Sequence, residues 1–414
     1  MFDGDESNFI IANNPENKTE VKHLSMCEDH IVNKQSSITN ITCVQDTTSG
    51  AYLLTKDNIQ IEEYHFNNII TYCDFDFFDK LDYLKNVMGD QGVYCGYGLI
   101  SMLLPNDFNY SKQISKGVVF EIKDGVVVSG YITKEIIGKS RNTITQILHN
   151  EYPYIIVKRF IDNLQYVVNQ WLGIHGFSIG LKDCLSDNKQ QIDYEINKQI
   201  IDAKNAEENI SNPLIREITV NSALNKAKDV GLKIAKDSLK PDNGFLTTVI
   251  SKSKGDFFNI CQITGLLSQQ IIFGERVPKL LNNNTRTMYH YPMKNISDLD
   301  RYKSRGFITN SFYEGLGPRE FFFHAMSGRE GIINTGSKTK DSGYIEHKLV
   351  KNMEDLLVQY DGTVRNSNGD ILQFKYNDGY DPCYRFKTGG KNNIINIKGI
   401  VDKLNKKYKI EKHF

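Results

Sequence analysis

Apolar residues recur at helical spacing on both sides of a polar stretch in the last third of the chain. Pro318 suits the first position of a helix, where its missing N–H needs no partner. Residues 321–333 and 344–356 supply apolar side chains at spacings of three and four. Residues 334–343 hold no large apolar side chain, and the glycines at 328, 331, 336 and 343 each weaken a helix by about 1 kcal/mol. The pattern by itself predicts a helix, a polar loop and a second helix.

Shorter patterns in the first half of the chain predict a mixed α/β region. The β-rich runs 117–122 and 126–132 flank a Lys-Asp-Gly turn at 123–125, which is a good hairpin signal. Residues 155–171 form an amphipathic pattern with a single apolar face. That face comprises Val157, Phe160, Ile161, Leu164 and Val168.

A helical hairpin is predicted between residues 186 and 240. Apolar residues recur at helical spacing in two runs that Ser211-Asn212-Pro213 separates. The first run is Ile192, Ile196, Ile200 and Ala203, and the second is Leu224, Ala227, Val230 and Ile234. The charged residues between them are typical of solvated faces, so this stretch is predicted to be a packed helix pair.

Composition narrows the class of protein. The chain has 414 residues, of which 40% are hydrophobic and 24% charged, as in a folded protein of two to four domains. Fifty basic and fifty acidic residues give no net charge, which is unusual for a free-standing nucleic-acid binder. The seven cysteines contain no CxxC pair, so no zinc site is predicted. Without a signal peptide or an apolar run near 18 residues, the chain is predicted to be soluble and intracellular, with no membrane contact.

Two short motifs carry candidate chemistry. Asp3 and Asp5 flank Gly4, and a glycine lets two carboxylates turn toward one hard cation, although such a triplet is also an ordinary turn. Lys254 lies in a Ser-Lys-Gly turn before a predicted helix, where backbone N–H groups and a lysine suit a phosphate. His290, His324 and His347 are too separated to form a metal set and are interpreted as structural.

The segment 305–381 resembles the bridge-helix region of the largest (β′-like) subunit of multisubunit DNA-directed RNA polymerases, of eukaryotic or viral type. The matching pieces are RGFITNSFYEGLGPREFFFHAMSGREGIINT, KT and SGYIEHKLVKNMEDLLVQYDGTVRNSNGDILQF. In that family the stretch is one helix that crosses the active-site cleft. The resemblance therefore predicts a continuous helix of about 37 residues and about 55 Å, in place of two helices and a loop.

The resemblance extends toward the start of the chain. IVNKQSSITNITCVQDTTSGAYLLTKDN, GLISMLLP and HGFSIGLKD occur in the family's order. It implies an α+β multidomain chain, a segment of a largest subunit of the double-psi-barrel type. The expected domains are the end of the catalytic aspartate loop (1–12), a mixed α/β pore domain (13–184), a funnel domain with its helical hairpin (185–304), the bridge-helix region (305–383) and a basic C-terminal tail (384–414).

For the metal, the resemblance implies magnesium. The family's N-A-D-F-D-G-D loop binds Mg²⁺ through three aspartates, and Asp3 and Asp5 match the second and third. Met1 stands at the place of the first, so the site within this sequence is incomplete. A split gene with the remaining part on another polypeptide, a fragment, or a mis-called exon would each account for this.

The resemblance also implies binding roles. Lys254 corresponds to a contact with the triphosphate of the incoming nucleotide, and Gln269 and Gln270 correspond to paired glutamines at the secondary channel. Ser268 replaces a usual glycine there. Lys338, Thr339 and Tyr344 correspond to the part of the bridge helix that contacts nucleic acid at the addition site, where a lysine favours phosphates and a tyrosine can stack.

The implied function is template-dependent RNA synthesis by two-metal nucleotidyl transfer. The expected partners are the second-largest subunit and other polymerase subunits, DNA template, RNA, nucleoside triphosphates and a polypeptide that carries the missing N-terminal and trigger-loop parts. The expected location is the nucleus, or a virion or cytoplasmic viral factory. The alternative is a non-catalytic remnant or assembly module that keeps the fold.

Overall fold

The computed structural model describes residues 6–33, 36–73, 77–115, 117–185, 189–292, 295–376, 386–388, 391–393 and 401. It divides into two compact units. Unit 1 comprises Met1–Phe177, Ile250–Lys254 and Lys375–Phe414, and unit 2 comprises Ser178–Val249 and Gly255–Phe374. Most of the predicted basic tail lies outside the described residues. The five predicted domain limits stay predictions.

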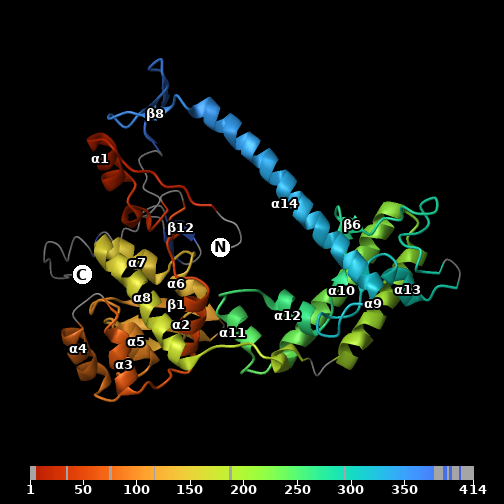
Figure 1. The fold of residues 1–414 in the computed structure, drawn as a ribbon, viewed down its shortest axis with the longest axis horizontal. Coiled ribbons are helices and arrows are strands. Elements are labelled where there is room, and N and C mark those ends of the chain that lie inside the picture. Colours follow the sequence, from red (N-terminus) through yellow and green to blue (C-terminus); the bar gives the residue numbers. More distant parts are fainter. Residues whose placement is uncertain are drawn as a thin grey trace. The chain divides into compact units, whose positions relative to one another are not determined.

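Unit 1 combines helices with one small antiparallel sheet (Figure 1). Its elements are α1 (Pro15–Leu24), η1 (Cys27–His30), α2 (Asp46–Lys56), α3 (Glu63–Ile70), α4 (Phe78–Met88), α5 (Gly96–Ser101), β1 (Tyr110–Ser115), β2 (Val118–Lys123), β3 (Val126–Ser129), α6 (Lys134–Ile137), α7 (Ile144–Glu151), α8 (Tyr154–His175), β11 (Phe386–Thr388) and β12 (Lys391–Asn393).

The sheet of unit 1 has the strand order β1-β2-β3, with β11 and β12 paired separately. Lys123 pairs with Val126 across a two-residue turn of Asp124 and Gly125. Both turn residues have positive φ, 45° and 71°, as a type I′ hairpin requires. The predicted hairpin is therefore confirmed, and β1 adds a third strand that the sequence pattern did not indicate.

The core of unit 1 is organised around α8. The predicted apolar face of this helix is buried, together with Val167 and Trp171. Helix α2 packs closely against it at Gly50, because a Cβ there would lie 2.5 Å from Val168 Cγ1. The predicted amphipathic helix is confirmed.

Unit 2 is mainly helical, with short two- and three-stranded sheets. Its elements are η2 (Leu181–Cys184), α9 (Lys189–Asn209), α10 (Pro213–Ser238), α11 (Gly244–Ile250, whose last residue belongs to unit 1), α12 (Phe257–Thr264), β4 (Ser268–Gln269), β5 (Ile271–Ile272), β6 (Glu275–Arg276), α13 (Asp298–Lys303), β7 (Phe307–Ile308), α14 (Pro318–Met353), β8 (Leu357–Val358), β9 (Val364–Arg365) and β10 (Ile371–Gln373). The pairings are β4 with β7, β5 with β6, and β8-β9-β10.

Helices α9 and α10 form the predicted hairpin and lie side by side in Figure 1. The Asn212 side chain accepts a hydrogen bond from the N–H of Leu214 at 3.0 Å, and Pro213 occupies the first helical position. The predicted apolar residues, except the half-buried Val230, are buried in one cluster that also contains Cys261 and Leu266.

Helix α14 is continuous over 36 residues, Pro318–Met353. The helix, loop and helix that the apolar pattern predicts is wrong here, and the single helix that the family resemblance implies is confirmed. In the polar middle the threonine hydroxyls find their partners within the helix itself: Thr335 Oγ1 donates to Gly331 O at 2.9 Å and Thr339 Oγ1 donates to Thr335 O at 2.7 Å. At 1.5 Å per residue the helix is about 54 Å long.

Within the described part of the chain, no helix combines the length and apolar character that crossing a membrane requires.

Candidate nucleic-acid interface

The first turn of α14 is fixed by one buried carboxylate. Glu320 Oε2 accepts hydrogen bonds from the N–H of Gly317 at 3.1 Å and from Asn310 Nδ2 at 3.0 Å. Lys303 Nζ lies 3.7 Å from the other oxygen. A negative charge at a helix N-terminus is favourable because the free N–H groups and the helix dipole point at it. Glu320 therefore sets where α14 begins.

The next turn is fixed by an apolar contact. Phe323 is buried in a cluster with Ile272, Val277 and Tyr291. The rings of Phe323 and Tyr291 are stacked with their centroids 6.5 Å apart, and Met288 and Met326 pack against the cluster. This cluster joins α14 to strand β5 and to the segment that follows β6.

Three polar contacts extend the attachment to Glu330. A ring nitrogen of His324, Nδ1, lies 3.1 Å from Gln270 Oε1. Ser327 Oγ donates to the carbonyl of Ile271 at 3.1 Å. Glu330 Oε1 accepts from the N–H of Phe273 at 2.9 Å. The first third of α14 is thus held by unit 2 through the β5–β6 hairpin.

Beyond Glu330 the helix is exposed. Ile332 is 71% exposed, and Ile345 is 54% exposed. Within the described residues, the side-chain hydrogen bonds and ion pairs of residues 331–353 stay inside the helix or reach only Glu354. An exposed helix of this length with apolar residues at its far end is a surface for other molecules, because isolated monomers rarely leave such patches uncovered.

The predicted nucleic-acid contacts lie on this exposed stretch. Lys338, Thr339 and Tyr344 are all exposed. At 100° per residue, Thr339 lies about 100° around the helix from Lys338, and Tyr344 lies about 120° from Lys338 on the other side. Lys348 Nζ lies 4.3 Å from the centre of the Tyr344 ring, so one face of that ring is covered. The three residues surround the helix and do not share one face.

The paired glutamines are buried. Gln269 Nε2 donates to the carbonyls of Gln270 and Arg305, both at 2.8 Å, and Gln270 Nε2 donates to Ser268 O at 3.3 Å. Their amides therefore join β4 to the segment before β7 and, through the contact of Gln270 with His324, to α14. Contact with a channel stays a prediction. Ser268 has a φ of 66°, which gives a physical reason for glycine at that position.

Lys254 is exposed, and within the described residues it has no ion pair. The helix that follows it, α12, is capped by the Asp256 side chain, whose Oδ1 accepts from the N–H of Asn259 at 3.0 Å. A carboxylate already occupies the helix N-terminus. The group left for a phosphate is the ammonium of Lys254.

A buried ionic network in unit 2 escaped the sequence analysis. Arg276 is 2% exposed and binds Glu217 with two hydrogen bonds, Nε to Oε1 at 2.8 Å and Nη2 to Oε2 at 2.6 Å. Arg305 Nη1 also binds Glu217, 2.8 Å from Oε1. Glu207 pairs with Arg301 at 3.0 Å.

The network holds Glu217 ionised. Burial alone would raise the pKa of Glu217, but the hydrogen bonds and positive charges of Arg276 and Arg305 outweigh it and lower the pKa to about 2. The residues are far apart in sequence and carry no local motif, so no sequence signal pointed to them. The network ties α9, α10, β6, α13 and the segment before β7 together.

The predicted magnesium ligands Asp3 and Asp5 lie outside the described residues. Among the residues that are described, no group of three or more His, Cys, Asp and Glu side chains is arranged to hold a metal ion.

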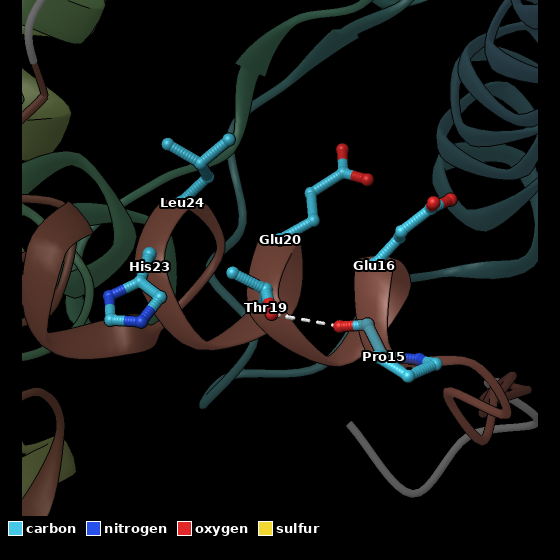
Figure 2. Close-up of a pocket in the computed structure, with 6 residues that line it drawn as sticks. All are labelled: Pro15, Glu16, Thr19, Glu20, His23 and Leu24. Atoms are coloured by element: carbon cyan, nitrogen blue, oxygen red, sulfur yellow. Dashed lines mark hydrogen bonds between the residues drawn. The ribbon is translucent and has the colours of Figure 1, made fainter.

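A shallow depression runs along one side of α1 (Figure 2). Pro15, Glu16, Thr19, Glu20, His23 and Leu24 line it. All six come from this one exposed helix, and the Thr19 hydroxyl donates to the Pro15 carbonyl at 2.8 Å. With no second element to enclose a ligand, this surface carries no candidate site.

Comparison with known protein families gives three consecutive matches. RNA polymerase Rpb1, domain 3, matches residues 30–184, domain 4 matches residues 191–308 and domain 5 matches residues 315–401.

Three curated proteins are similar along nearly the whole chain. A probable DNA-directed RNA polymerase II subunit RPB1 homolog of Invertebrate iridescent virus 6 is 39% identical, over 98% of this chain and 42% of that protein. The DNA-directed RNA polymerase II subunits RPB1-A and RPB1-B of Trypanosoma brucei brucei are each 31% identical, over 92% of this chain and 22% of theirs. The chain thus spans less than half the length of these relatives. It belongs to the family of the RNA polymerase largest subunit, of which it covers Rpb1 domains 3 to 5.

Proposed function

We propose that this chain is part of the catalytic core of a DNA-directed RNA polymerase and that α14 is its bridge helix. The observation that carries the proposal is the division of α14 at Glu330. The helix is anchored through contacts up to Glu330, and the 23 residues that follow, 331–353, are all exposed except the half-buried Asn334. A helix with a polar, basic middle and no core of its own suits a cleft that holds nucleic acid, where Lys338 contacts phosphate and Tyr344 offers a stacking face.

The rest of the chain takes its proposed roles from the same family. Unit 1 serves as the pore domain beneath the active site, and the α9–α10 hairpin serves as the funnel. Lys254 contacts the triphosphate of the incoming nucleotide, because its ammonium is exposed and has no ion pair in the described residues. The reaction is nucleotidyl transfer from a nucleoside triphosphate to the RNA 3′ end, directed by a DNA template.

The proposed metal is magnesium, because the proposed ligands are carboxylates. Asp3 and Asp5 are hard oxygen donors of the kind that Mg²⁺ binds, and they would supply two of its ligands. When bound, the ion lowers the pKa of the attacking hydroxyl and neutralises negative charge on the phosphates.

Exposed apolar side chains support assembly with other polymerase subunits. In the far half of α14, Ile345, Leu349 and Met353 are each more than half exposed, and they recur every four residues along one face. Leu357 and Phe374, near the sheet that follows, are exposed as well. Apolar surface of this extent is covered in the proposed complex, and the second-largest subunit is the proposed partner.

The test is isolation of the tagged chain from its native source, followed by an RNA-synthesis assay. We expect a second-largest polymerase subunit to co-purify and Asp5→Ala to abolish magnesium-dependent synthesis. Asp90→Ala is the matched control, because Asp90 is exposed in a turn of unit 1. If the complex synthesises RNA equally well with Asp5→Ala, the catalytic role is wrong. The alternative, a non-catalytic assembly module, would then be favoured.

A further inference from the structure

The loop that carries Lys254 is built into unit 1, although the chain on both sides of it belongs to unit 2. Ile250–Lys254 groups with Met1–Phe177, whereas Val249 and Gly255 group with unit 2. Gly255 has a φ of 70°, a conformation that lets the chain turn away directly after Lys254. The position of Lys254 is therefore set by contacts of this five-residue loop with unit 1.

Two contacts with α6 hold the first part of the loop. The carbonyl of Ser251 accepts a hydrogen bond from the N–H of Lys134 at 3.0 Å. The ammonium of Lys252 forms an ion pair with the carboxylate of Glu135. Lys252 has a φ of 59°, which is uncommon for a lysine and requires that the surroundings hold it.

A chain of three serine hydroxyls holds the residue next to Lys254. Ser49 Oγ, on α2, donates to Ser253 Oγ at 2.7 Å, and Ser251 Oγ lies 3.0 Å from Ser253 Oγ. Ser49 and Ser251 are buried, so both hydroxyls depend on partners within the protein. The Ser49–Ser253 bond joins residues 204 positions apart in sequence.

The two lysines of the loop differ in what their charges face. Glu135 neutralises Lys252, whereas the exposed Lys254 has no ion pair among the described residues. The free charge thus follows directly after the residue that the hydroxyl chain fixes. A fixed backbone beside a free ammonium lowers the entropy lost when the ammonium binds a phosphate.

We propose that Ser49 and Ser253 are positioning residues that fix Lys254 for the triphosphate of the incoming nucleotide. This inference rests on the proposed function of Lys254. The two serines do not contact the nucleotide. They act through Lys254, so removing either hydroxyl weakens nucleotide binding only while Lys254 is present.

The experiment uses the assembled polymerase and measures KM and kcat for single-nucleotide addition. It compares the variants Ser253→Ala, Ser253→Thr, Ser49→Ala, Lys254→Ala and the double variant Ser253→Ala/Lys254→Ala. We expect Ser253→Ala and Ser49→Ala each to raise KM about five- to tenfold with kcat little changed, the size of one net hydrogen bond. Ser253→Thr keeps the hydroxyl and should restore KM to within about twofold.

The decisive comparison is the double variant. If Ser253 acts through Lys254, the double variant has the KM of Lys254→Ala, whereas a purely structural effect would add to it. Thr48→Val is the matched control, because Thr48 lies beside Ser49 on α2 and its hydroxyl bonds to Cys43 O at 3.5 Å, away from the loop. This control should leave KM unchanged.

The outcomes separate the two proposals. An unchanged KM in Lys254→Ala overturns the triphosphate contact and the positioning role together. A raised KM in Lys254→Ala with an unchanged KM in both serine variants overturns the positioning role alone. Additive effects in the double variant, or equal effects from Thr48→Val, also overturn it. Thermal denaturation of each variant identifies any that fail to fold, and if one of Ser253→Ala and Ser49→Ala does, the other supplies the measurement, because each removes one end of the same hydrogen bond.

Discussion

The two helices α8 and α14 show two ways in which this chain stabilises a long helix. Helix α8 has 22 residues and buries eight of them, including Phe160 and Trp171. Helix α14 has 36 residues and buries two, Glu320 and Phe323, both in its first two turns. The longer helix therefore has far less core contact per residue.

The difference shows that α14 is anchored at one end, whereas α8 is fixed along its length. Each fully buried large apolar side chain contributes about 1.5–3 kcal/mol, so the face of α8 stabilises unit 1 strongly. Residues 331–353 of α14 have no such contribution within the described chain and depend on helix-internal bonds. The exposed side chains of such a helix are available to bind other molecules. They contribute little to the free energy of folding until a partner buries them.

The largest difference is expected between two truncations, one in α8 and one in α14. Phe160→Ala should lower the free energy of unfolding of unit 1 by about 3–5 kcal/mol, because it leaves a cavity in the core. Ile345→Ala in α14 should change stability by less than about 0.5 kcal/mol, because Ile345 is exposed. Urea denaturation followed by the fluorescence of Trp171, the single tryptophan of the chain, reports on unit 1, and far-UV circular dichroism reports on both units. A loss above 1 kcal/mol for Ile345→Ala would contradict the comparison.

The second prediction concerns charge at the base of α14. Glu217→Gln should destabilise unit 2 by about 2–3 kcal/mol, because it removes the carboxylate that binds the buried Arg276 with two hydrogen bonds. The folded pKa of Glu217, about 2, lies below its ordinary value of 4.5. Its contribution is therefore fully present above about pH 5 and is lost as the pH falls toward 2.

Acid titration of the Glu217→Gln variant tests the sign of that effect. The loss of ellipticity in the parent chain between pH 5 and 2 should be smaller in the variant, measured relative to the variant's own stability at pH 7. Glu121→Gln is a suitable control, because the Glu121 carboxylate pairs with the exposed Lys123 at the surface of unit 1. An acid transition that is identical in Glu217→Gln and the parent would show that the network does not set it.

The third prediction uses the same substitution in two places. Gly50→Ala should destabilise unit 1 by about 1–3 kcal/mol, because the new Cβ would lie 2.3 Å from Leu172 Cδ1 and 2.5 Å from Val168 Cγ1. Gly336→Ala has no atom within 4 Å of its Cβ and should stabilise α14 by about 0.5–1 kcal/mol. Urea denaturation measures the first, and amide hydrogen exchange of residues 331–353 measures the second. If both substitutions destabilise the protein, or both stabilise it, the contrast between the packed site at Gly50 and the exposed site at Gly336 is wrong.

The smallest effect on stability is expected for Lys338→Ala. Lys338 is exposed and lies in the polar middle of α14, so its loss should leave the unfolding free energy within about 0.5 kcal/mol. In the assembled polymerase, the same change should lower the slope of log affinity for nucleic acid against log salt by about 1, the value for one phosphate contact. Lys351→Ala is the control, because Lys351 already pairs with Glu354 at 2.8 Å. An equal change of slope in both variants would remove the assignment to Lys338.

Local patterns predicted the elements that pack against a core. The face of α8, the β2–β3 hairpin and the α9–α10 hairpin follow from apolar periodicity and turn residues, because each buries a regular face in its own unit. The same reasoning failed at residues 334–343. A helix that faces no core has no apolar stripe, so only the resemblance to a family indicated that α14 is continuous.

For the candidate site, too, the sequence indicated one part and the tertiary structure decided the other. The sequence, together with the family resemblance, indicated the candidate residues: Lys254 in the 251–254 turn, Lys338 on α14, and Asp3 and Asp5 near the start. Only the tertiary structure decided which of them are free. It paired Lys252 with Glu135 and left Lys254 exposed, buried Gln269 and Gln270, and joined Glu217 to Arg276 and Arg305. Whether a charge is neutralised or available depends on its neighbours in space, and residues 59 to 204 positions apart become neighbours only when the chain folds.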